Sequence, residues 1–267
     1  MVPQDMGNSI AVAVLRLSRI PSCIVAFLTV FIPTYAHTHD LRRALAVSAP
    51  IFLVSACTFI LNDLNDVERD RINHPHRPLP LGAITPRTAA IAYLTIFVIA
   101  LGLIHTLAEV SLHFLYLSIF LLAINYNTIV NHIAELKTAY VAGTITLALT
   151  LVCRIVGAEL DWNLLASAFF FILGRELLMD VQDWKGDGPT IAKRFSPRAV
   201  TWLAFGLQCI SALILLLIAQ AALEAAAASI FSVLLFIVIS EWWNEGQRRR
   251  LLQLMQFQML AGIAFLV

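Results

Sequence analysis

The sequence predicts an all-α fold, a polytopic membrane bundle of about nine transmembrane helices around a central cavity. Of its 267 residues, 60% are hydrophobic and only 13% are charged. The mean hydropathy of +0.82 lies far above that of soluble globular proteins. The apolar residues gather in stretches of about 20 residues, the length that a helix needs to cross a bilayer. The net charge of +1 provides no basic face for a nucleic acid, so we expect no nucleic-acid partner.

Nine apolar segments follow one another along the chain, and we read each as a membrane-spanning helix. They are residues 12–36, 44–62, 87–107, 111–131, 138–158, 162–180, 199–220, 223–243 and 251–267. We expect two pseudo-repeats of four helices with the last helix appended, and an active cavity between the two halves. The whole chain, 1–267, is then a single transmembrane domain.

The distribution of lysine and arginine predicts the orientation in the membrane. These residues are concentrated in the connections after the second, fourth, sixth and eighth predicted helices, whereas the alternate connections carry only Arg42 and Arg43. Cytoplasmic loops are enriched in positive charge. We therefore expect an integral protein of a bacterial cell membrane, with an active site that opens to the cytoplasmic side.

The second predicted helix ends in an acidic sequence, Asn62-Asp63-Leu64-Asn65-Asp66-Val67-Glu68-Arg69-Asp70. Residues three and four apart are neighbours on a helix, so Asp63, Asp66 and Asp70 share one face. Because isolated charge is costly at membrane depth, we expect this face to border a protein interior or an aqueous cavity and to be neutralised by cations.

The same aspartate spacing returns at the end of the sixth predicted helix. Two facing sets of carboxylates would hold divalent ions, and oxygen ligands of this kind suit Mg²⁺, which also binds substrate phosphates. The sequence thus predicts a magnesium-dependent diphosphate site. The expected metal ligands are Asn62, Asp63, Asp66, Asp70, Asp180, Asp183 and Asp187. Four of them are expected to be catalytic, namely Asp66, Asp70, Asp183 and Asp187.

A proline-rich stretch follows the first acidic sequence and predicts a structured cap rather than a continuous helix. Thr85 and Pro86 are expected to be the N-cap and the first residue of the next helix. Arg71 and Arg77 are candidates to bind diphosphate oxygens bidentately. The alternative is that these arginines only neutralise the aspartates or place positive charge on the cytoplasmic side.

Polar residues inside other apolar segments are further candidates for substrate binding. Tyr126 and Asn127 end the fourth predicted helix, and Lys137 begins the fifth. Tyr126 could bind a phosphate oxygen or stack on a carbocation, and Lys137 could contact the diphosphate. An interfacial aromatic residue and a positive-inside lysine explain the same residues. Arg175 with Glu176 is expected to face inward as a pair, with a purely structural ion pair as the alternative.

Together these residues resemble a known family. Asn62-Asp63-x2-Asp66-x3-Asp70, the turn Arg77-Pro78-Leu79-Pro80-x-Gly82, and Asp180-x2-Asp183-x3-Asp187 look like the aspartate motifs and the Arg-Pro turn of the UbiA superfamily of intramembrane prenyltransferases. The resemblance implies a helical bundle with a lateral opening to the lipid bilayer, Mg²⁺ ions and an isoprenyl diphosphate donor. It also implies that Asn62, Asp66 and Asp70 match the first metal motif and that Asp183 and Asp187 match the second. Asn127 stands where the family often has serine, which leaves the acceptor contacts open.

These residues are compatible with three functions. In the first, cations stabilise the leaving diphosphate, and a lipophilic, aromatic acceptor then takes the prenyl group. In the second, a double bond of the same chain traps the carbocation, which makes the protein a membrane terpene cyclase without an acceptor. The third, a cation transporter, is disfavoured because both acidic clusters lie at helix ends rather than at the membrane midplane.

Overall fold

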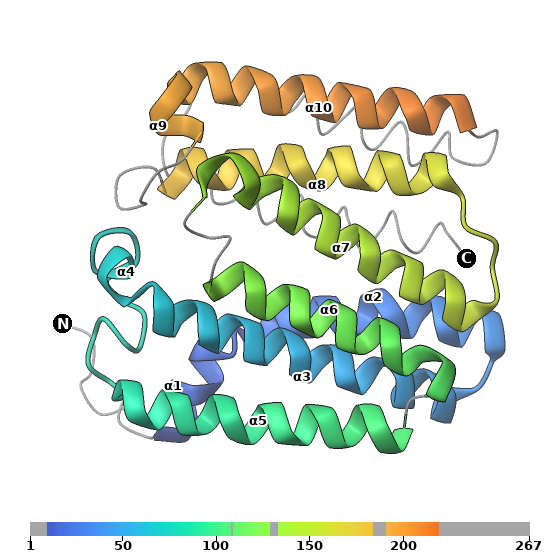
Figure 1. The fold of residues 1–267 in the computed structure, drawn as a ribbon, viewed down its shortest axis with the longest axis horizontal. Coiled ribbons are helices and arrows are strands. Elements are labelled where there is room, and N and C mark those ends of the chain that lie inside the picture. Colours follow the sequence, from blue (N-terminus) through green and yellow to red (C-terminus); the bar gives the residue numbers. More distant parts are fainter. Residues whose placement is uncertain (1–9, 108, 129–132, 184–190, 219–267) are drawn as a thin grey trace. The chain divides into compact units, whose positions relative to one another are not determined.

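The computed structural model describes residues 10–107, 109–128, 133–183 and 191–218, and this part of the chain is helical as expected (Figure 1). The chain divides into two compact units, Met1–Ile129 and Val130–Val267. The first unit contains α1 to α6 and the second contains α7 to α10. The division falls near the end of the fourth predicted span, 111–131, close to where the two groups of helices were expected to separate. The pseudo-repeat itself stays a prediction.

Helix α3 (Leu41–Asn65) is the centre of the first unit. It packs against α2 (Ile20–Thr38), α5 (Pro86–Leu107) and α6 (Val110–Thr128), which lie around it in Figure 1. Half of the apolar window of α3 is buried inside the protein, against 11% of that of α5. The apolar surface of α5 is therefore left to face lipid, while α3 positions the acidic sequence at its end.

The first predicted span, 12–36, is wrong as a single helix. The structure has a short helix, α1 (Ile10–Leu17), followed by α2. Between them Arg19 adopts the left-handed conformation with φ 47° and ψ 54°, which ends one helix and turns the chain into the next. Pro21 lies in the first turn of α2, where proline is tolerated. Ala13 and Leu17 of α1 are buried in a cluster that also contains Ile60, Leu79, Ile84 and Ala89.

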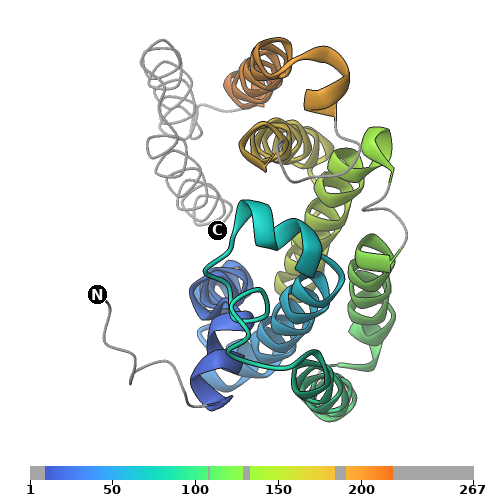
Figure 2. The ribbon, with the colours of Figure 1, turned by 90° about the vertical axis from the view of Figure 1, so that its left-hand side faces the viewer.

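The acidic sequence spans a second helix break. Helix α3 ends at Asn65, and the short helix α4 (Val67–Asn73) begins after Asp66. Helix α4 and the turn that follows lie at one end of α3 (Figure 2). Within this turn Gly82 has a φ of +72°, a conformation that suits glycine. Thr85 caps α5 by accepting a hydrogen bond from the Thr88 amide at 3.2 Å, so the predicted helix start is confirmed.

In the second unit, α8 (Trp162–Asp183) packs against α7 (Ala134–Val156) and α10 (Pro197–Ile218). The short helix α9 (Ile191–Phe195) lies beside α8 and α10. Small and polar residues join α8 to α10. Ser167 and Ser211 exchange hydrogen bonds, and the Gln208 amide donates to the Phe171 carbonyl at 2.8 Å. Such contacts hold helices together in lipid, where apolar burial alone gives little driving force.

The expected total of nine spanning helices stays a prediction. Among the described residues there are ten helices, of which five are long and apolar enough to cross a membrane. These five are α2, α3, α5, most of α7 and most of α10. The apolar part of α6 is shorter, and α8 carries four charged residues in its C-terminal half. The predicted spans 223–243 and 251–267 lie outside the described residues.

Candidate active site

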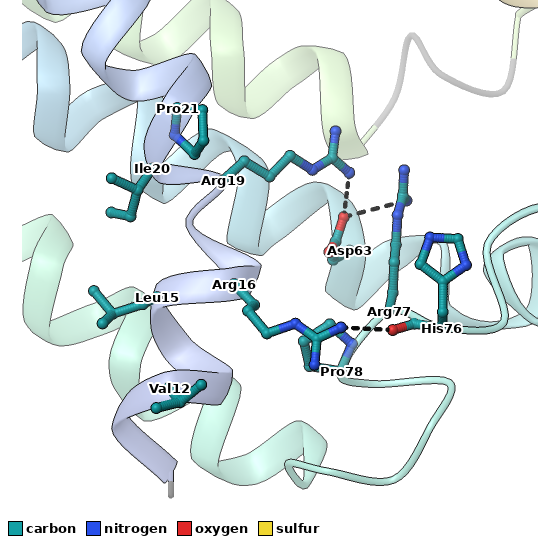
Figure 3. A pocket seen from close by; sticks show the side chains of 10 residues that line it. All are labelled: Val12, Leu15, Arg16, Arg19, Ile20, Pro21, Asp63, His76, Arg77 and Pro78. Atoms are coloured by element: carbon teal, nitrogen blue, oxygen red, sulfur yellow. Dashed lines mark hydrogen bonds and ion pairs between the residues drawn. The ribbon is translucent and has the colours of Figure 1, made fainter. Parts of the chain in front are cut away.

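Asp63 lies in the last turn of α3 and belongs to the first aspartate sequence of the candidate site. Its side chain is only 2% exposed, and its Oδ1 accepts a hydrogen bond from Arg19 Nη2 at 2.5 Å. The same oxygen lies 3.4 Å from Arg77 Nη1 (Figure 3). A buried carboxylate is costly unless it is paired with a charge. Asp63 therefore joins α3 to the α1–α2 break and to the turn after α4.

Arg77 bridges two carboxylates on either side of the helix break. Its Nη1 lies 2.6 Å from both carboxylate oxygens of Asp70 and also reaches Asp63. Burial raises the pKa of Asp70 above its ordinary value, and the hydrogen bond and charge of Arg77 offset part of that effect. A single guanidinium thus holds both acidic side chains beside the turn.

Asp66 lies at the break itself, between α3 and α4. Its side chain is 14% exposed, and its Oδ1 is 3.0 Å from Arg69 Nη1. The Asp66 amide donates to the Asn62 carbonyl, which keeps the chain helical up to the break. Because α3 ends here, the aspartates do not lie on one continuous helix, as the spacing suggested. Asp63 and Asp70 meet instead through Arg77, whereas Asp66 pairs with Arg69.

Arg71 was expected beside the acidic cluster, and the described contacts do not place it there. It is 59% exposed and pairs with Glu68, which is 78% exposed. Neighbouring residues on a helix point about 100° apart. Arg71 therefore leaves α4 in a different direction from Asp70, which meets Arg77.

A pocket of about 470 Å³ opens beside Asp63 (Figure 3). Its lining residues are Val12, Leu15, Arg16, Arg19, Ile20, Pro21, Asp63, His76, Arg77 and Pro78. Arg16 Nη2 donates to the carbonyl oxygen of His76 at 3.2 Å. Arg16 and Arg19 were not among the residues expected from the sequence. The available signal was that they interrupt an apolar segment, where charged residues usually have a function.

The second unit contains the other aspartate sequence, at the end of α8. Asp180 is 2% exposed, and its Oδ1 lies 2.7 Å from Lys137 Nζ near the start of α7. The lysine expected at the diphosphate and the aspartate expected at the metal are thus paired with each other. Asp183 lies half-buried in the last turn of α8, and Asp187 lies outside the described residues.

The remaining candidates have different surroundings. Arg175 pairs with its neighbour Glu176, and both side chains are largely buried. Arg175 Nε has no hydrogen-bond partner among the described residues. Tyr126 is half-buried near the end of α6, and the side chain of Asn127 lies outside the part of the chain that is described.

The carboxylates at the junction of α3 and α4 suit a magnesium ion that binds only a few protein side chains. Asp66 and Asp70 are carboxylates at a helix junction, the donor type that Mg²⁺ prefers. In the described ranges, no group of three or more His, Cys, Asp or Glu side chains could enclose a metal. Magnesium is commonly bound by one or two carboxylates together with waters and substrate phosphates. The junction therefore fits an ion that arrives with a phosphate-bearing substrate.

Comparison with known proteins decides the family. The model of the UbiA prenyltransferase family matches residues 21–261. The chain belongs to this family. It is accordingly a multi-pass integral membrane protein, and the UbiA resemblance noted from its motifs is confirmed.

Several curated relatives of this UbiA-family chain are archaeal digeranylgeranylglyceryl phosphate synthases. That of Methanoculleus marisnigri is 31% identical over 181 residues, which cover 66% of this chain and 64% of the relative. That of Methanoregula boonei is 29% identical over 204 residues, which cover 71% and 70%. The aligned part of the chain thus spans less than two thirds of the length of the first of these relatives.

Solved structures show the same fold at low sequence identity. A UbiA homologue from Aeropyrum pernix has a TM-score of 0.76 at 15% identity, covering 92% of this chain and 98% of the homologue. A homologue from Archaeoglobus fulgidus bound to GPP and Mg²⁺ has a TM-score of 0.69 at 18% identity, covering 94% and 99%. A digeranylgeranylglyceryl phosphate synthase has a TM-score of 0.67 at 19% identity, covering 96% of both chains.

Proposed function

We propose that this UbiA-family protein catalyses the magnesium-dependent transfer of a prenyl group from a prenyl diphosphate to a hydroxyl group of a glyceryl phosphate lipid. The observation that carries the proposal is the acidic junction, where the Asp70 carboxylate meets the guanidinium of Arg77 and the Asp66 carboxylate meets that of Arg69. The relatives named above support it, because they are called digeranylgeranylglyceryl phosphate synthases. That name contains no aromatic group, so the glyceryl phosphate replaces the aromatic acceptor expected from the sequence.

The chemistry requires a stabilised leaving group. Diphosphate leaves only when its developing negative charge is balanced, and magnesium acts there as a Lewis acid. Arg77 and Lys137 are the side chains that we assign to the diphosphate oxygens. The bond between the first prenyl carbon and the diphosphate oxygen breaks, and its electrons remain on diphosphate. The acceptor oxygen forms an ether bond to that carbon and releases its proton.

Both aspartate sequences are proposed to act on one diphosphate from the cytoplasmic side of a cell membrane. The support for this is their shared spacing and the basic loops that follow them. The bacterial origin of that membrane stays a prediction, because the relatives compared above are archaeal.

Removal of single carboxylates tests the proposal. Asp66→Ala and Asp183→Ala should abolish magnesium-dependent turnover of prenyl diphosphate while the purified protein stays folded in detergent. The matched control is Glu68→Ala, since Glu68 is an exposed acid on α4. Released diphosphate and folding by circular dichroism are measured for all three variants. Full activity in either aspartate variant would refute the proposed site.

An acceptor panel separates the candidate reactions. Geranylgeranyl diphosphate is incubated with the protein alone, with a monoalkyl glyceryl phosphate, and with a lipophilic phenol. An ether formed only with the glyceryl phosphate supports the proposal. A cyclised hydrocarbon or alcohol without acceptor would identify a terpene cyclase, and a prenylated phenol would restore the aromatic acceptor.

A further inference from the structure

The pocket beside Asp63 is electropositive. Among the described residues, its lining includes the guanidinium groups of Arg16, Arg19 and Arg77 but only one carboxylate, that of Asp63. Figure 3 shows Arg19 and Arg77 directed at Asp63 from two sides, with Arg16 next to them. An excess of clustered arginine is a typical recognition site for phosphate, because each guanidinium can donate two parallel hydrogen bonds.

The described contacts leave hydrogen-bonding capacity on the two arginines of the α1–α2 region. Arg16 is exposed and uses Nη2 for one hydrogen bond of 3.2 Å to a backbone carbonyl. Arg19 is 30% exposed, uses Nη2 on Asp63, and lies 5.0 Å from the ring centre of Phe59. A guanidinium has five N–H donors. Both side chains can therefore bind an anion without giving up the contacts that position them.

Apart from His76, the rest of the lining is apolar. Val12, Leu15, Ile20 and Pro21 belong to α1 and the first turn of α2. Leu15 is 54% exposed and Val12 is 39% exposed. Helix α2 is one of the candidate membrane spans. The pocket thus combines a cationic wall with an apolar wall at the end of a spanning helix, which suits a ligand with an anionic head and an apolar chain.

We propose that this pocket binds the phosphate group of the glyceryl phosphate acceptor, with Arg16 and Arg19 as its ligands. Asp63 is then a positioning residue that holds Arg19 and Arg77 at the pocket. A phosphate monoester carries about −1.5 to −2 charges at neutral pH and three acceptor oxygens, which match the donors left on Arg16 and Arg19. This inference rests on the proposed function, because it assigns a place to the second substrate of that reaction.

In this arrangement Arg77 lies between the proposed binding sites of the two substrates. Its Nη1 contacts Asp70, on the side where the donor diphosphate is proposed to bind, and also Asp63, which lines the pocket. One guanidinium therefore separates the acceptor phosphate from the carboxylates of the donor site. The hydroxyl that is prenylated lies only a few bonds from its phosphate, so a phosphate held in this pocket keeps the acceptor close to the donor.

Kinetics of arginine variants test the inference. In Arg16→Gln, the KM for a monoalkyl glyceryl phosphate should rise about 10-fold to 100-fold, the loss expected for one charge-assisted hydrogen bond. The kcat and the KM for prenyl diphosphate should change less than about twofold, since uniform binding of one substrate is lost. Arg87→Gln is the matched control, because Arg87 is an exposed arginine in the first turn of α5 and does not line the pocket.

Arg19 needs a second variant because it also neutralises Asp63. Arg19→Lys keeps the positive charge and loses the bidentate geometry, so it should fold and raise the same KM. Titration calorimetry with monoalkyl glyceryl phosphate, in the absence of prenyl diphosphate, measures binding directly. The affinity should fall in Arg16→Gln by the same factor as the KM rises, and the unphosphorylated monoalkyl glycerol should bind at least about 10-fold more weakly to the unsubstituted protein.

Competition experiments test whether the pocket prefers the phosphate of the acceptor to other anions. Phosphatidylglycerol is a phosphodiester of the membrane, and inorganic phosphate has no apolar chain. If either displaces the monoalkyl glyceryl phosphate at equal concentration, the pocket is a general anion site and the inference is overturned. Prenyl transfer with an unchanged acceptor KM in Arg16→Gln and Arg19→Lys also overturns it, while the proposed function stands. Absence of any transfer to a glyceryl phosphate refutes the proposed function itself.

Discussion

The ion pair between Arg19 and Asp63 offers a sharp test of how the first unit is held together. Asp63 is 2% exposed and Arg19 is 30% exposed, and their atoms lie 2.5 Å apart. A charge-assisted hydrogen bond contributes about 1.5–3 kcal/mol to stability. Water can replace part of the contact at the half-exposed arginine. We therefore expect a coupling energy of about 1–2 kcal/mol, within the range measured for residues in contact.

A double-mutant cycle measures this energy. The free energy of unfolding is determined in detergent for Arg19→Gln, Asp63→Asn, the double variant and the unsubstituted protein. The control cycle uses Arg71→Gln and Glu68→Gln, a pair at 2.7 Å whose side chains are 59% and 78% exposed. An exposed pair of this kind should couple by only about 0.3–0.5 kcal/mol. Equal coupling energies in the two cycles would refute the structural role assigned to Asp63.

Three further predictions follow from the packing and charge of other residues. Gly174→Ala should destabilise the protein by about 1–3 kcal/mol, because the new Cβ would lie 2.7 Å from the Gln208 side chain. At Gly206 no atom of the described residues lies within 4 Å of an added Cβ, so Gly206→Ala should be neutral or stabilising; thermal unfolding measures both variants. Tyr116→Phe removes the hydrogen bond that the buried hydroxyl donates to a carbonyl of α3 and should lower the unfolding free energy by about 1 kcal/mol. Because burial raises the pKa of Asp70, its contribution to stability should grow as pH falls through the folded-state pKa and shrink as pH rises. The difference in unfolding free energy between the protein and Asp70→Asn, measured without magnesium, should show that trend, and a difference that is constant with pH would contradict it.

Hydropathy located the long helices well but missed the break at Arg19. The span predicted at 87–107 is observed as Pro86–Leu107, because a capped apolar run has only one plausible structure in a membrane. Residues 12–36 are also largely apolar, yet Arg19 turns the chain in a left-handed conformation. Hydropathy cannot detect that turn, since the break depends on the packing of α1 against the end of α3. The only local hint was Pro21, which favours a helix start.

The acidic residues were recognisable from their spacing, whereas their partners were not. Asp63 meets Arg19 across 44 positions of the chain, and such a contact leaves no periodic signal in the sequence. Lys137 and Asp180 were both singled out, but as ligands of different groups, and only the structure pairs them at 2.7 Å. Spacing along one helix predicts which side chains share a face. It does not predict which cation another segment brings to that face.

The shared nitrogen of Arg77 also bears on any attempt to redesign substrate preference. Because it contacts Asp63 and Asp70 together, a substitution there would alter folding and catalysis at once, and the two effects could not be separated. Arg16 lies on the surface of the same pocket and makes one backbone contact. Libraries that aim to broaden the acceptor range should therefore vary Arg16 and its apolar neighbours and keep Arg77 constant.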